Sequence, residues 1–425
     1  MNQPKIGIGD ISIYIPSPRL DMKTLLENRA LTHPELERMF ARTIKKTGLV
    51  SFRFPEPWED TASLAANAAA SILDRMSKEE QKTFRYLSVG TETAIDYSKP
   101  VASYVQGMLQ NAGYPIGSKM TTFEVKHACA GGTTAMLTSA AMLGYSENPQ
   151  ERAMAISSDI ARYEAPSTAE VTQGAGAVAI MLEKNPGLLE LDLGKIGLYA
   201  SDVDDFYRPL GSVTARVKGR YSMECYQHAL EGAMDDFCDK SGCRTCEILE
   251  ETDYLAFHVP FPTMPESALR KLLKNRCGKN SGEIDQYIER TGFTEALYLS
   301  SSVGNLYTGS LFAYIAALLN QEYRKIGNKI IGKRILIASY GSGNTMILFS
   351  AEIASKAPDL IKNWNIDKLL STYKDASFDE YLQWLARPRD TSIWKNLLEG
   401  AKPNKGEFYL KDFNDAELRI YNRAT

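Results

Sequence analysis

The protein has 425 residues, of which 44% are hydrophobic and 24% charged, so its composition is that of a globular chain rather than a disordered or fibrous one. The formal net charge is −3, which leaves no basic excess for a nucleic-acid backbone. The N-terminus lacks the pattern of a secretion signal, and no stretch approaches the roughly 20 apolar residues of a membrane span. Six cysteines fit a reducing compartment. We therefore expect a soluble, cytoplasmic protein of two or three units that contacts neither nucleic acid nor membrane.

The first half of the chain alternates strand-like and helix-like segments. Apolar and polar residues alternate from 6 to 15 and predict a first strand, which ends at Pro16. The segments that follow predict, in order, a helix at 60–76, a strand from 85 that ends near Glu92, a helix at 101–113, a strand from 121, a turn at Cys129 with a helix of small residues after it, and strands at 152–162 and 172–183. This alternation predicts a layered α/β architecture.

The second half repeats the order of the first. In the first half, Cys129 precedes a predicted helix, and a Gly-Ala-Gly turn and a strand follow about 45 residues later. In the second half, Asn305 precedes a predicted helix at 306–319, which is followed by a strand at 333–340, a Gly-Ser-Gly turn at 341–343 and another strand. This echo predicts a duplication, with halves at 1–185 and 186–425, although a chance similarity would give the same pattern. Residues 186–250 predict a connection with an irregular insert, and the tail from about 356 predicts an extension of mixed helix and loop.

Cys129 is the first candidate for chemistry. It lies between a strand-like run and a helix that begins Ala130-Gly131-Gly132, so its sulfur is expected at a helix N-terminus, where the helix dipole can lower the pKa of a thiol. The two glycines would let a substrate carbonyl approach the backbone, as an oxyanion site requires. The alternative is a small buried hydrophobe.

The other cysteines offer less. Cys243 and Cys246 form a Cys-x-x-Cys pair, but no fourth zinc ligand stands at a suitable spacing, and no thioredoxin-like unit surrounds the pair. We therefore expect no metal. The turn at 341–343 lacks the Gly-x-x-x-x-Gly-Lys and Gly-x-Gly-x-x-Gly patterns, which argues against a nucleotide site.

Two further residues are candidates by their setting. His258 follows an apolar strand-like run and precedes a proline-bounded loop, where a catalytic imidazole or a structural histidine would both fit. Glu92 lies in the uncharged stretch VGTETAI after a buried strand, so it is either a helix-start charge or a general base with a raised pKa. His127 lies two residues before Cys129 and is expected behind it rather than in contact with substrate.

Eight motifs in order then give a family resemblance: GTETAIDYSKP with Glu92, HACAGGT with Cys129, SDIARY, TQGAGAVA, DFYRP, FHVPF with His258, GNLYTGSL with Asn305, and SYGSG. In this set, which spans nearly the whole chain, the sequence resembles the hydroxymethylglutaryl-CoA synthase family of thiolase-fold condensing enzymes. The resemblance implies a five-layer αβαβα fold built from two βαβαβαββ halves, a homodimer, and a place in the mevalonate pathway.

The resemblance also implies a mechanism. Cys129 would take an acetyl group from acetyl-CoA as a thioester, and Glu92 would remove a proton from its methyl group so that the enolate attacks the ketone of acetoacetyl-CoA. His258 and Asn305 would hold the acetoacetyl group, while Tyr163, Gly341 and Ser342 would line the acyl site. The CoA thioesters are then substrates, and no cofactor is implied.

One departure from the family pattern leaves the carrier of the acyl group open. After FHVPF the chain has Thr263 and Glu266 where the family usually has lysines that meet CoA phosphates. Arg270, Lys271 and Lys274 follow on the same predicted helix and would substitute, as would the basic group Arg216, Lys218 and Arg220. The alternative is a relative that accepts β-ketoacyl groups from an acyl carrier protein in polyketide β-branching. A ketoacyl synthase of the third type would lack Glu92, and a non-catalytic scaffold would be expected to lose Cys129, Glu92 or His258.

Overall fold

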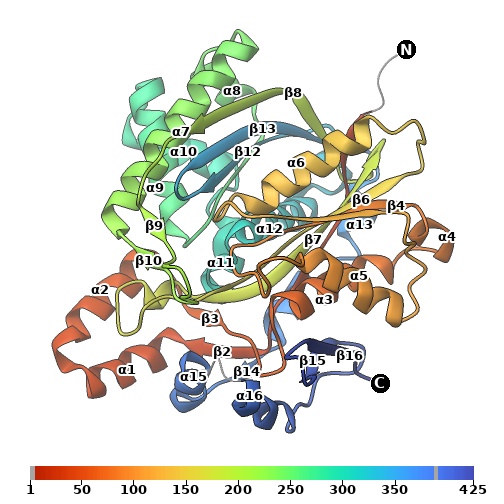
Figure 1. Cartoon of the computed structure of the whole chain (residues 1–425). Coiled ribbons are helices and arrows are strands. Elements are labelled where there is room, and N and C mark those ends of the chain that lie inside the picture. The colour runs from red at the N-terminus through yellow and green to blue at the C-terminus, as the bar shows by residue number, and fades with distance from the viewer. Residues whose placement is uncertain (1–4, 387–390) are drawn as a thin grey trace.

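A nine-stranded mixed sheet runs through the whole protein in the computed structural model, which describes residues 5–386 and 391–425 (Figure 1). Its strands lie in the order β11-β12-β13-β8-β1-β7-β6-β4-β5. Their bounds are β1 (Ile6–Tyr14), β4 (Phe84–Gly90), β5 (Thr121–Val125), β6 (Arg152–Ala161), β7 (Gly174–Lys184), β8 (Leu189–Ala200), β11 (Tyr254–Phe257), β12 (Arg334–Gly341) and β13 (Thr345–Ile353).

The two ends of this sheet have the same topology. In the first half β4, β5 and β6 are parallel, and β7 runs antiparallel to both β6 and β1. In the second half β11 and β12 are parallel, and β13 runs antiparallel to both β12 and β8. A short antiparallel pairing of β1 with β8 joins the halves. The repeated order confirms the duplicated α/β fold expected from the echo between the halves.

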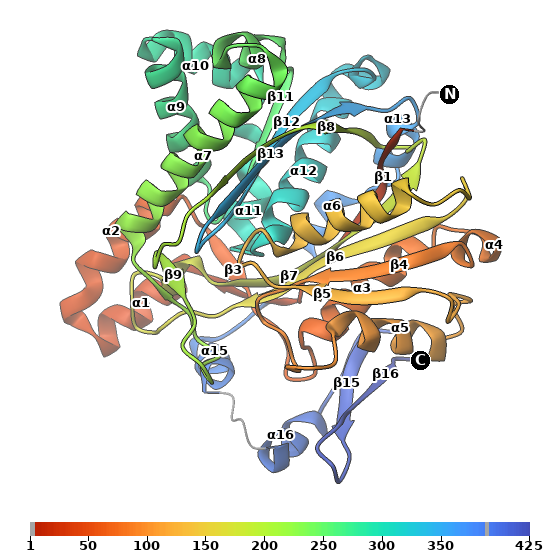
Figure 2. The same cartoon turned by 45° about the horizontal axis from the view of Figure 1, so that its top comes forward.

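Helices form three layers around the two halves of the sheet (Figure 2). Two helices, α6 (Gly131–Gly144) and α12 (Thr308–Ile326), lie between them. The outer layers are α3 (Thr61–Leu73) with α5 (Val101–Asn111) on one side and α7 (Gly219–Ser241) with α9 (Thr263–Cys277) on the other.

The sequence of α12 explains its central place. Every residue from Thr308 to Asn320 is buried, because TGSLFAYIAALLN carries no charge and presents an apolar or small surface on all sides.

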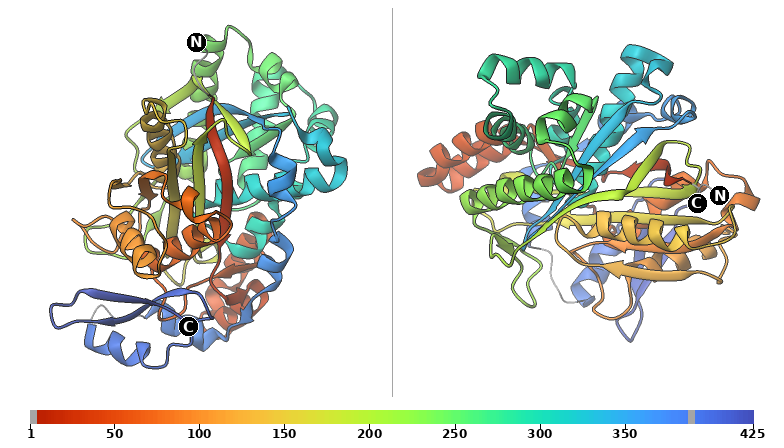
Figure 3. Two further views of the ribbon diagram at one scale, coloured as in Figure 1. Left: turned by 90° about the vertical axis from the view of Figure 1, so that its right-hand side faces the viewer. Right: turned by 90° about the horizontal axis from the view of Figure 1, so that it is seen from above.

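The remaining elements lie around these layers. A small sheet of β2, β3 and β14 packs with α1, α2 and α15, and the hairpin β15–β16 lies beside α3 and α5 (Figure 3). Their bounds are α1 (Met22–Thr32), α2 (Glu37–Thr47), α4 (Lys78–Gln81), α8 (Thr245–Glu251), α10 (Ser281–Arg290), α11 (Tyr298–Val303), α13 (Ala357–Ile361), α14 (Ile366–Ser371), α15 (Phe378–Leu385), α16 (Thr391–Leu398), β2 (Pro18–Asp21), β3 (Ser51–Arg53), β9 (Phe206–Tyr207), β10 (Arg216–Val217), β14 (Lys374–Asp375), β15 (Phe408–Phe413) and β16 (Arg419–Arg423).

The sequence prediction for residues 186–250 was right for the irregular insert, which spans 201–218 and holds only the short strands β9 and β10, but it was wrong for the rest of the region. This region contains β8, which pairs with β13 and β1, and the 23-residue helix α7, which covers β8 and β13. Five of the twelve side chains in β8 are only partly buried and five are exposed, so the strand lacks the apolar run of a central strand.

Two cysteines outside the Cys129 turn form a disulfide, which differs from the expectation of cysteines in a reducing compartment. Cys246 pairs with Cys277 in a disulfide between α8 and α9, so the two cysteines of the Cys-x-x-Cys motif do not pair with each other. Cys243 is a free, partly buried thiol. Within residues 5–386 and 391–425, no cluster of His, Cys, Asp and Glu side chains could hold a metal ion, and no helix is long and apolar enough to cross a membrane.

Candidate active site

Cys129 lies in the turn between β5 and α6, one residue before the N-cap of α6, and its side chain is buried. The backbone of the preceding Ala128 has a φ of 39°, a left-handed conformation that is uncommon for alanine and typical of constrained functional turns. Thr308 at the start of α12 fixes this turn, because its hydroxyl donates to the carbonyl oxygen of Cys129 at 2.6 Å and accepts from the N–H of Gly132 at 3.0 Å. The first turns of the two central helices are therefore joined at the candidate nucleophile.

The two glycines after Cys129 serve packing rather than an oxyanion site, which corrects the expectation from the sequence. The N–H of Gly131 donates to Ala128, and that of Gly132 donates to Thr308, so neither N–H is free for substrate. A Cβ on Gly132 would lie 2.0 Å from the hydroxyl of Ser157 on β6. Only glycine lets α6 approach the sheet this closely.

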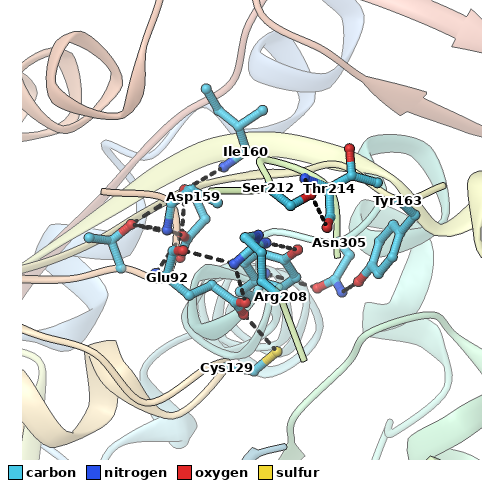
Figure 4. Close-up of polar contacts among 12 residues, drawn as sticks. Glu92, Cys129, Asp159, Ile160, Tyr163, Arg208, Ser212, Thr214 and Asn305 are labelled. Carbon is cyan, nitrogen blue, oxygen red and sulfur yellow. Dashed lines mark hydrogen bonds and ion pairs between the residues drawn. The ribbon is translucent and has the colours of Figure 1, made fainter. Parts of the chain in front are cut away.

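Glu92 is the nearest acid to the thiol. Its Oε1 lies 4.0 Å from Cys129 Sγ, a contact in which the thiol is the donor. The carboxylate side chain is 5% exposed, and it forms an ion pair with Arg208, whose Nη1 lies 3.0 Å from Oε2. The same Nη1 donates to the backbone carbonyl of Glu92 at 2.9 Å. Figure 4 shows Arg208 between Glu92 and the pair formed by Asn305 and Tyr163.

A second buried carboxylate, Asp159 on β6, holds the turn that carries Glu92. Its Oδ1 accepts from the N–H of Glu92 at 3.0 Å, from the hydroxyl of Thr91 at 2.8 Å, and from both the hydroxyl and the N–H of Thr93, at 2.7 and 3.2 Å. Four hydrogen bonds to one carboxylate oxygen fix the backbone at residues 91–93, and hence the direction in which Glu92 points.

Burial sets the protonation of these groups. It raises the pKa of the Glu92 carboxyl, and Asp159 adds to the rise while the Arg208 guanidinium opposes it. Burial, with the nearby carboxylates of Glu92 and Asp159, also raises the pKa of the Cys129 thiol well above its ordinary range. The sequence had indicated a lowered thiol pKa from the helix dipole, and this was wrong, because desolvation and two carboxylates oppose the anion.

This arrangement gives a prediction for Arg208. Replacing it by alanine removes the cation that favours ionised Glu92, so the pKa of Glu92 rises and any rate that needs the carboxylate is lost at higher pH than in the wild type. The acidic limb of the pH–rate profile should therefore move to higher pH in Arg208→Ala. In Arg208→Lys, which retains the charge, the limb should move less. An unchanged acidic limb in Arg208→Ala would exclude a role for Arg208 in the ionisation of Glu92.

Tyr163, Asn305 and Tyr307 form the neighbouring wall. The side-chain amide of Asn305 donates to the phenol oxygen of Tyr163 at 3.2 Å, and Asn305 Oδ1 accepts from the N–H of Tyr307 at 2.8 Å. Tyr307 is fully buried with a φ of 51°, and its hydroxyl lies 3.4 Å from Arg208 Nη2. Cys129, Tyr163 and Tyr307 share one apolar cluster, so the thiol lies at an apolar wall with a polar amide beside it.

His258 lies at the carboxyl end of β11, with its N–H donating to Ala338 on β12 and its carbonyl accepting from the hydroxyl of Tyr226. The imidazole is buried, and burial lowers its pKa to about 3, so it is neutral at ordinary pH. Its Nδ1 has no hydrogen-bond partner among the described residues. A buried, unpartnered ring nitrogen is suited to a polar group of a ligand.

The end of β12 packs onto the Cys129 turn, and a loop follows it. A Cβ on Gly341 would lie 2.7 Å from the Cβ of Ala130, so this position also requires glycine. Ser342 follows and is partly buried. Asp205 of the DFYRP motif anchors the loop, accepting from the hydroxyl of Tyr340 and the N–H of Gly343, both at 2.9 Å.

The basic residues predicted on α9 either pair with carboxylates or are exposed. Arg270 forms ion pairs with Glu266 at 2.8 Å and Asp285 at 2.6 Å, so its charge is already balanced by the protein. Lys271 is exposed. Among the described residues, no hydrogen bond or ion pair connects either side chain to Cys129 or Glu92.

One protein family matches nearly the whole chain. Residues 3–186 match the N-terminal region of hydroxymethylglutaryl-coenzyme A synthase, and residues 189–291 and 282–424 match its C-terminal region. The chain belongs to the hydroxymethylglutaryl-CoA synthase family. The family predicted from the eight motifs is thereby confirmed.

The relatives of this chain include a synthase named for CoA and one named for acyl carrier protein. The chain is 30% identical to hydroxymethylglutaryl-CoA synthase of Enterococcus faecalis over 399 residues, covering 93% of this chain and 96% of the relative. It is 27% identical over 386 residues to the polyketide biosynthesis 3-hydroxy-3-methylglutaryl-ACP synthase PksG of Bacillus subtilis, covering 88% and 86%.

The solved structures confirm the thiolase-like fold. MvaS in complex with 3-hydroxy-3-methylglutaryl coenzyme A superposes with a TM-score of 0.86 at 30% identity, covering 99% of this chain and 100% of MvaS. The HMG synthase of the curacin pathway in complex with acetyl donor-ACP has a TM-score of 0.84 at 25% identity, with the same coverage.

Sequence reasoning missed three residues of the site: Arg208, Asp159 and Thr308. Arg208 and Asp159 lie in the motifs DFYRP and SDIARY, so the motifs marked their segments without indicating that they meet Glu92. Thr308 lies in the motif GNLYTGSL, which likewise did not indicate that its hydroxyl meets Cys129, 179 positions away.

Proposed function

We propose that this synthase family member condenses acetyl-CoA with acetoacetyl-CoA and water to give 3-hydroxy-3-methylglutaryl-CoA and CoA. The observation that carries the proposal is the 4.0 Å contact between Cys129 Sγ and Glu92 Oε1 in a buried, largely apolar site. A thiol and a carboxyl so placed can hold an acyl group and take a proton from its methyl carbon.

The reaction proceeds in three steps. Cys129 attacks the carbonyl of acetyl-CoA, an acetyl thioester forms, and the thiol proton leaves with the CoA sulfur. Glu92 then removes a proton from the acetyl methyl group, and the resulting carbanion forms a carbon–carbon bond to the ketone carbon of acetoacetyl-CoA, whose oxygen takes up a proton. Water finally cleaves the thioester, which frees the Cys129 thiol and leaves a carboxylate on the product.

His258 and Asn305 supply donors for the second substrate. The neutral imidazole of His258, with its unpartnered Nδ1, fits the oxygen of a ketone or thioester. Asn305 presents its amide beside Tyr163 in the apolar wall. Preorganised donors of this kind stabilise negative charge that develops on oxygen during bond formation.

The prediction for His258 separates binding from nucleophilic attack. His258→Ala should still become acetylated on Cys129, whereas acetoacetyl-CoA should bind about 10-fold or more weakly, because a buried ligand oxygen loses its donor. Mass spectrometry of the acetylated protein and a titration with acetoacetyl-CoA measure the two effects. Loss of acetylation with normal binding of acetoacetyl-CoA would assign His258 to activation of the thiol instead.

Acyl carrier protein is the alternative carrier of the acetoacetyl group, favoured by Thr263 and Glu266 after FHVPF and by the similarity to PksG. We favour CoA because the E. faecalis synthase is more similar over more of the chain. Turnover should be compared with the acetoacetyl group on CoA and on a phosphopantetheinylated carrier protein. Turnover on the carrier alone would replace the proposal by the β-branching reaction.

Family membership also supports further proposals. We place the reaction in the mevalonate pathway and expect the protein to be a cytoplasmic homodimer. We also divide the chain into halves at 1–185 and 186–425. The division is supported by the short connection between Lys184 at the end of β7 and Leu189 at the start of β8. Sedimentation equilibrium tests the homodimer.

A turnover assay tests the proposed function itself. Incubation with acetyl-CoA and acetoacetyl-CoA should release one free CoA thiol for each molecule of 3-hydroxy-3-methylglutaryl-CoA found by mass spectrometry. Release of CoA with acetate as the acyl product would show that the protein acts as a thioesterase, and it would contradict the proposal.

A further inference from the structure

Gln173, the residue before β7, holds both residues of the hydrogen-bonded pair Tyr163 and Asn305, named here the Tyr163–Asn305 pair. Its side-chain Oε1 accepts from the N–H of Tyr163 at 3.2 Å, and its backbone carbonyl accepts from the N–H of Asn305, also at 3.2 Å. Gln173 is fully buried. A Cβ on the next residue, Gly174, would lie 2.5 Å from the backbone nitrogen of Asn305, so the two segments pack against each other through their backbones. The orientation of Gln173 therefore bears on both residues of the pair.

The hydroxyl of Tyr381 on α15 holds the other end of the Gln173 amide. It accepts from Gln173 Nε2 at 2.7 Å and donates to Oε1 of Glu170, also at 2.7 Å. Glu170 is fully buried and forms an ion pair with Arg29 of α1, in which Arg29 Nη2 lies 2.6 Å from Glu170 Oε1. A continuous chain of hydrogen bonds thus runs from α1 through α15 to the Tyr163–Asn305 pair.

The donors and acceptors in this chain fit together in one arrangement. A carboxylate paired with a guanidinium only accepts, so the Tyr381 proton points to Glu170 and the phenol oxygen is left to accept from Gln173. The amide nitrogen of Gln173 then faces Tyr381, and its oxygen faces the backbone N–H of Tyr163, which only donates. The Tyr381 hydroxyl thus fixes the direction of the Gln173 amide.

Helix α15 contacts the same segment at a second point. Arg162, the neighbour of Tyr163, donates from Nη2 to the carbonyl oxygen of Trp384 at 2.9 Å, and its guanidinium carbon lies 4.5 Å from the centre of the Trp384 ring. The ring of Tyr381 is buried in the apolar cluster that joins α15 to β2 and β3. Because these contacts do not involve the Tyr381 hydroxyl, removal of the hydroxyl alone should leave α15 in place.

We propose that Tyr381 is a positioning residue for condensation: through Gln173, its hydroxyl holds the Tyr163–Asn305 pair in the arrangement that receives the acetoacetyl group. The proposal rests on the proposed function, in which Asn305 supplies a donor for that group. Tyr381 lies in the tail after residue 356, which the sequence predicted only as an extension of mixed helix and loop. The extension thereby takes part in positioning the second substrate.

Acetylation should not depend on this chain of hydrogen bonds. The Cys129 turn is fixed by Thr308, and the turn that carries Glu92 is fixed by Asp159. Among the described residues, no hydrogen bond of Tyr381 reaches either turn. We therefore expect loss of the Tyr381 hydroxyl to weaken binding of acetoacetyl-CoA and to leave acetylation of Cys129 unchanged.

Tyr381→Phe keeps the ring and removes only the hydroxyl. In the Cys129→Ala background, which prevents acyl transfer, calorimetric titration should show that the Kd for acetoacetyl-CoA rises about 3- to 10-fold, the effect of one hydrogen bond. With Cys129 intact, the rate of acetylation by acetyl-CoA should stay at the wild-type value.

The matched control is Tyr287→Phe on α10. It removes a buried hydroxyl that donates to the carbonyl oxygen of Leu249 at 2.9 Å, and it should change neither the Kd nor the acetylation rate. An unchanged Kd in Tyr381→Phe, or equal losses of binding and acetylation, would overturn the proposal.

A double-mutant cycle tests the route through Gln173. Gln173→Met keeps the length of the side chain and removes the amide. If Tyr381 acts through Gln173, adding Tyr381→Phe to Gln173→Met should raise the Kd for acetoacetyl-CoA no further. Additive effects of the two substitutions would overturn the route.

A fluorine label at Tyr163 reports on the pair without any turnover. 3-Fluorotyrosine introduced at position 163 should give a ¹⁹F resonance that moves in Tyr381→Phe and stays in place in Tyr287→Phe, because only the first substitution frees the Gln173 amide. A resonance that stays in place in both variants would overturn the proposal, and this measurement still decides it if Gln173→Met does not fold. Wild-type protein that fails to bind acetoacetyl-CoA, while the resonance moves in Tyr381→Phe, would instead contradict the proposed function.

Discussion

Replacing Cys129 by alanine is expected to abolish formation of the acetyl-enzyme and to lower turnover by at least about 10⁴-fold, because the acyl group loses its only covalent attachment point. The Cys129 side chain is buried, and alanine keeps the apolar wall intact, so the fold should persist. The acetylated peptide is identified by mass spectrometry after brief incubation with acetyl-CoA.

A matched control for this experiment is Cys225 on α7. It is also a buried free thiol whose pKa is raised, in first place by burial, but it lies outside the Cys129 cluster. Cys225→Ala should retain the acetyl group on Cys129 and full turnover. An adduct that persists in Cys129→Ala, or one that disappears only in Cys225→Ala, would show that the nucleophile had been assigned to the wrong residue.

Replacing Glu92 by glutamine is expected to separate the two halves of the reaction. Condensation should fall by about 10²–10⁴-fold, the usual contribution of a general base, since glutamine cannot accept the methyl proton. Acetylation of Cys129 should survive, because the carboxylate of Glu92 is one of the groups that raise the pKa of the thiol and its removal favours the thiolate.

Single-turnover kinetics measure this separation. The acetyl-enzyme is formed first, acetoacetyl-CoA is added, and the product is followed by rapid quench. Glu59→Gln provides the control, because Glu59 is likewise a buried carboxyl with a pKa raised by burial, to about 7, and it bonds Tyr14 rather than any residue of the site. Condensation at the wild-type rate in Glu92→Gln would place the base elsewhere, with His127 as the next residue to test.

The sequence predicted the parts of the fold that local pattern controls. The strand that became β1, the helix of small residues that became α6 and the uncharged stretch 308–320 of α12 all carry local patterns that do not depend on their partners. It did not predict β8, whose partly exposed side chains lack the apolar run expected of a central strand, or α7, whose buried face was hidden among polar residues.

The candidate site was predictable where motifs marked single residues and unpredictable where distant segments meet. Cys129 and Glu92 were named from their settings, and the structure brings them together. Their protonation was not predictable, because it depends on Arg208, which joins the site from a segment 116 residues away from Glu92. The glycines after Cys129 were misread for the same reason, since Ser157 and Thr308 become their neighbours only in the folded chain.

The transfer of a labelled acetyl group tests the central claim, that Cys129 carries the carbon unit that Glu92 activates. Protein acetylated with ¹⁴C-acetyl-CoA and freed of excess donor is mixed with unlabelled acetoacetyl-CoA, and the label is followed on the Cys129 peptide and in the product. The label should leave Cys129 and appear, in one turnover, in 3-hydroxy-3-methylglutaryl-CoA. Label that stays on Cys129 while product forms, or that leaves only as acetate, would contradict the account.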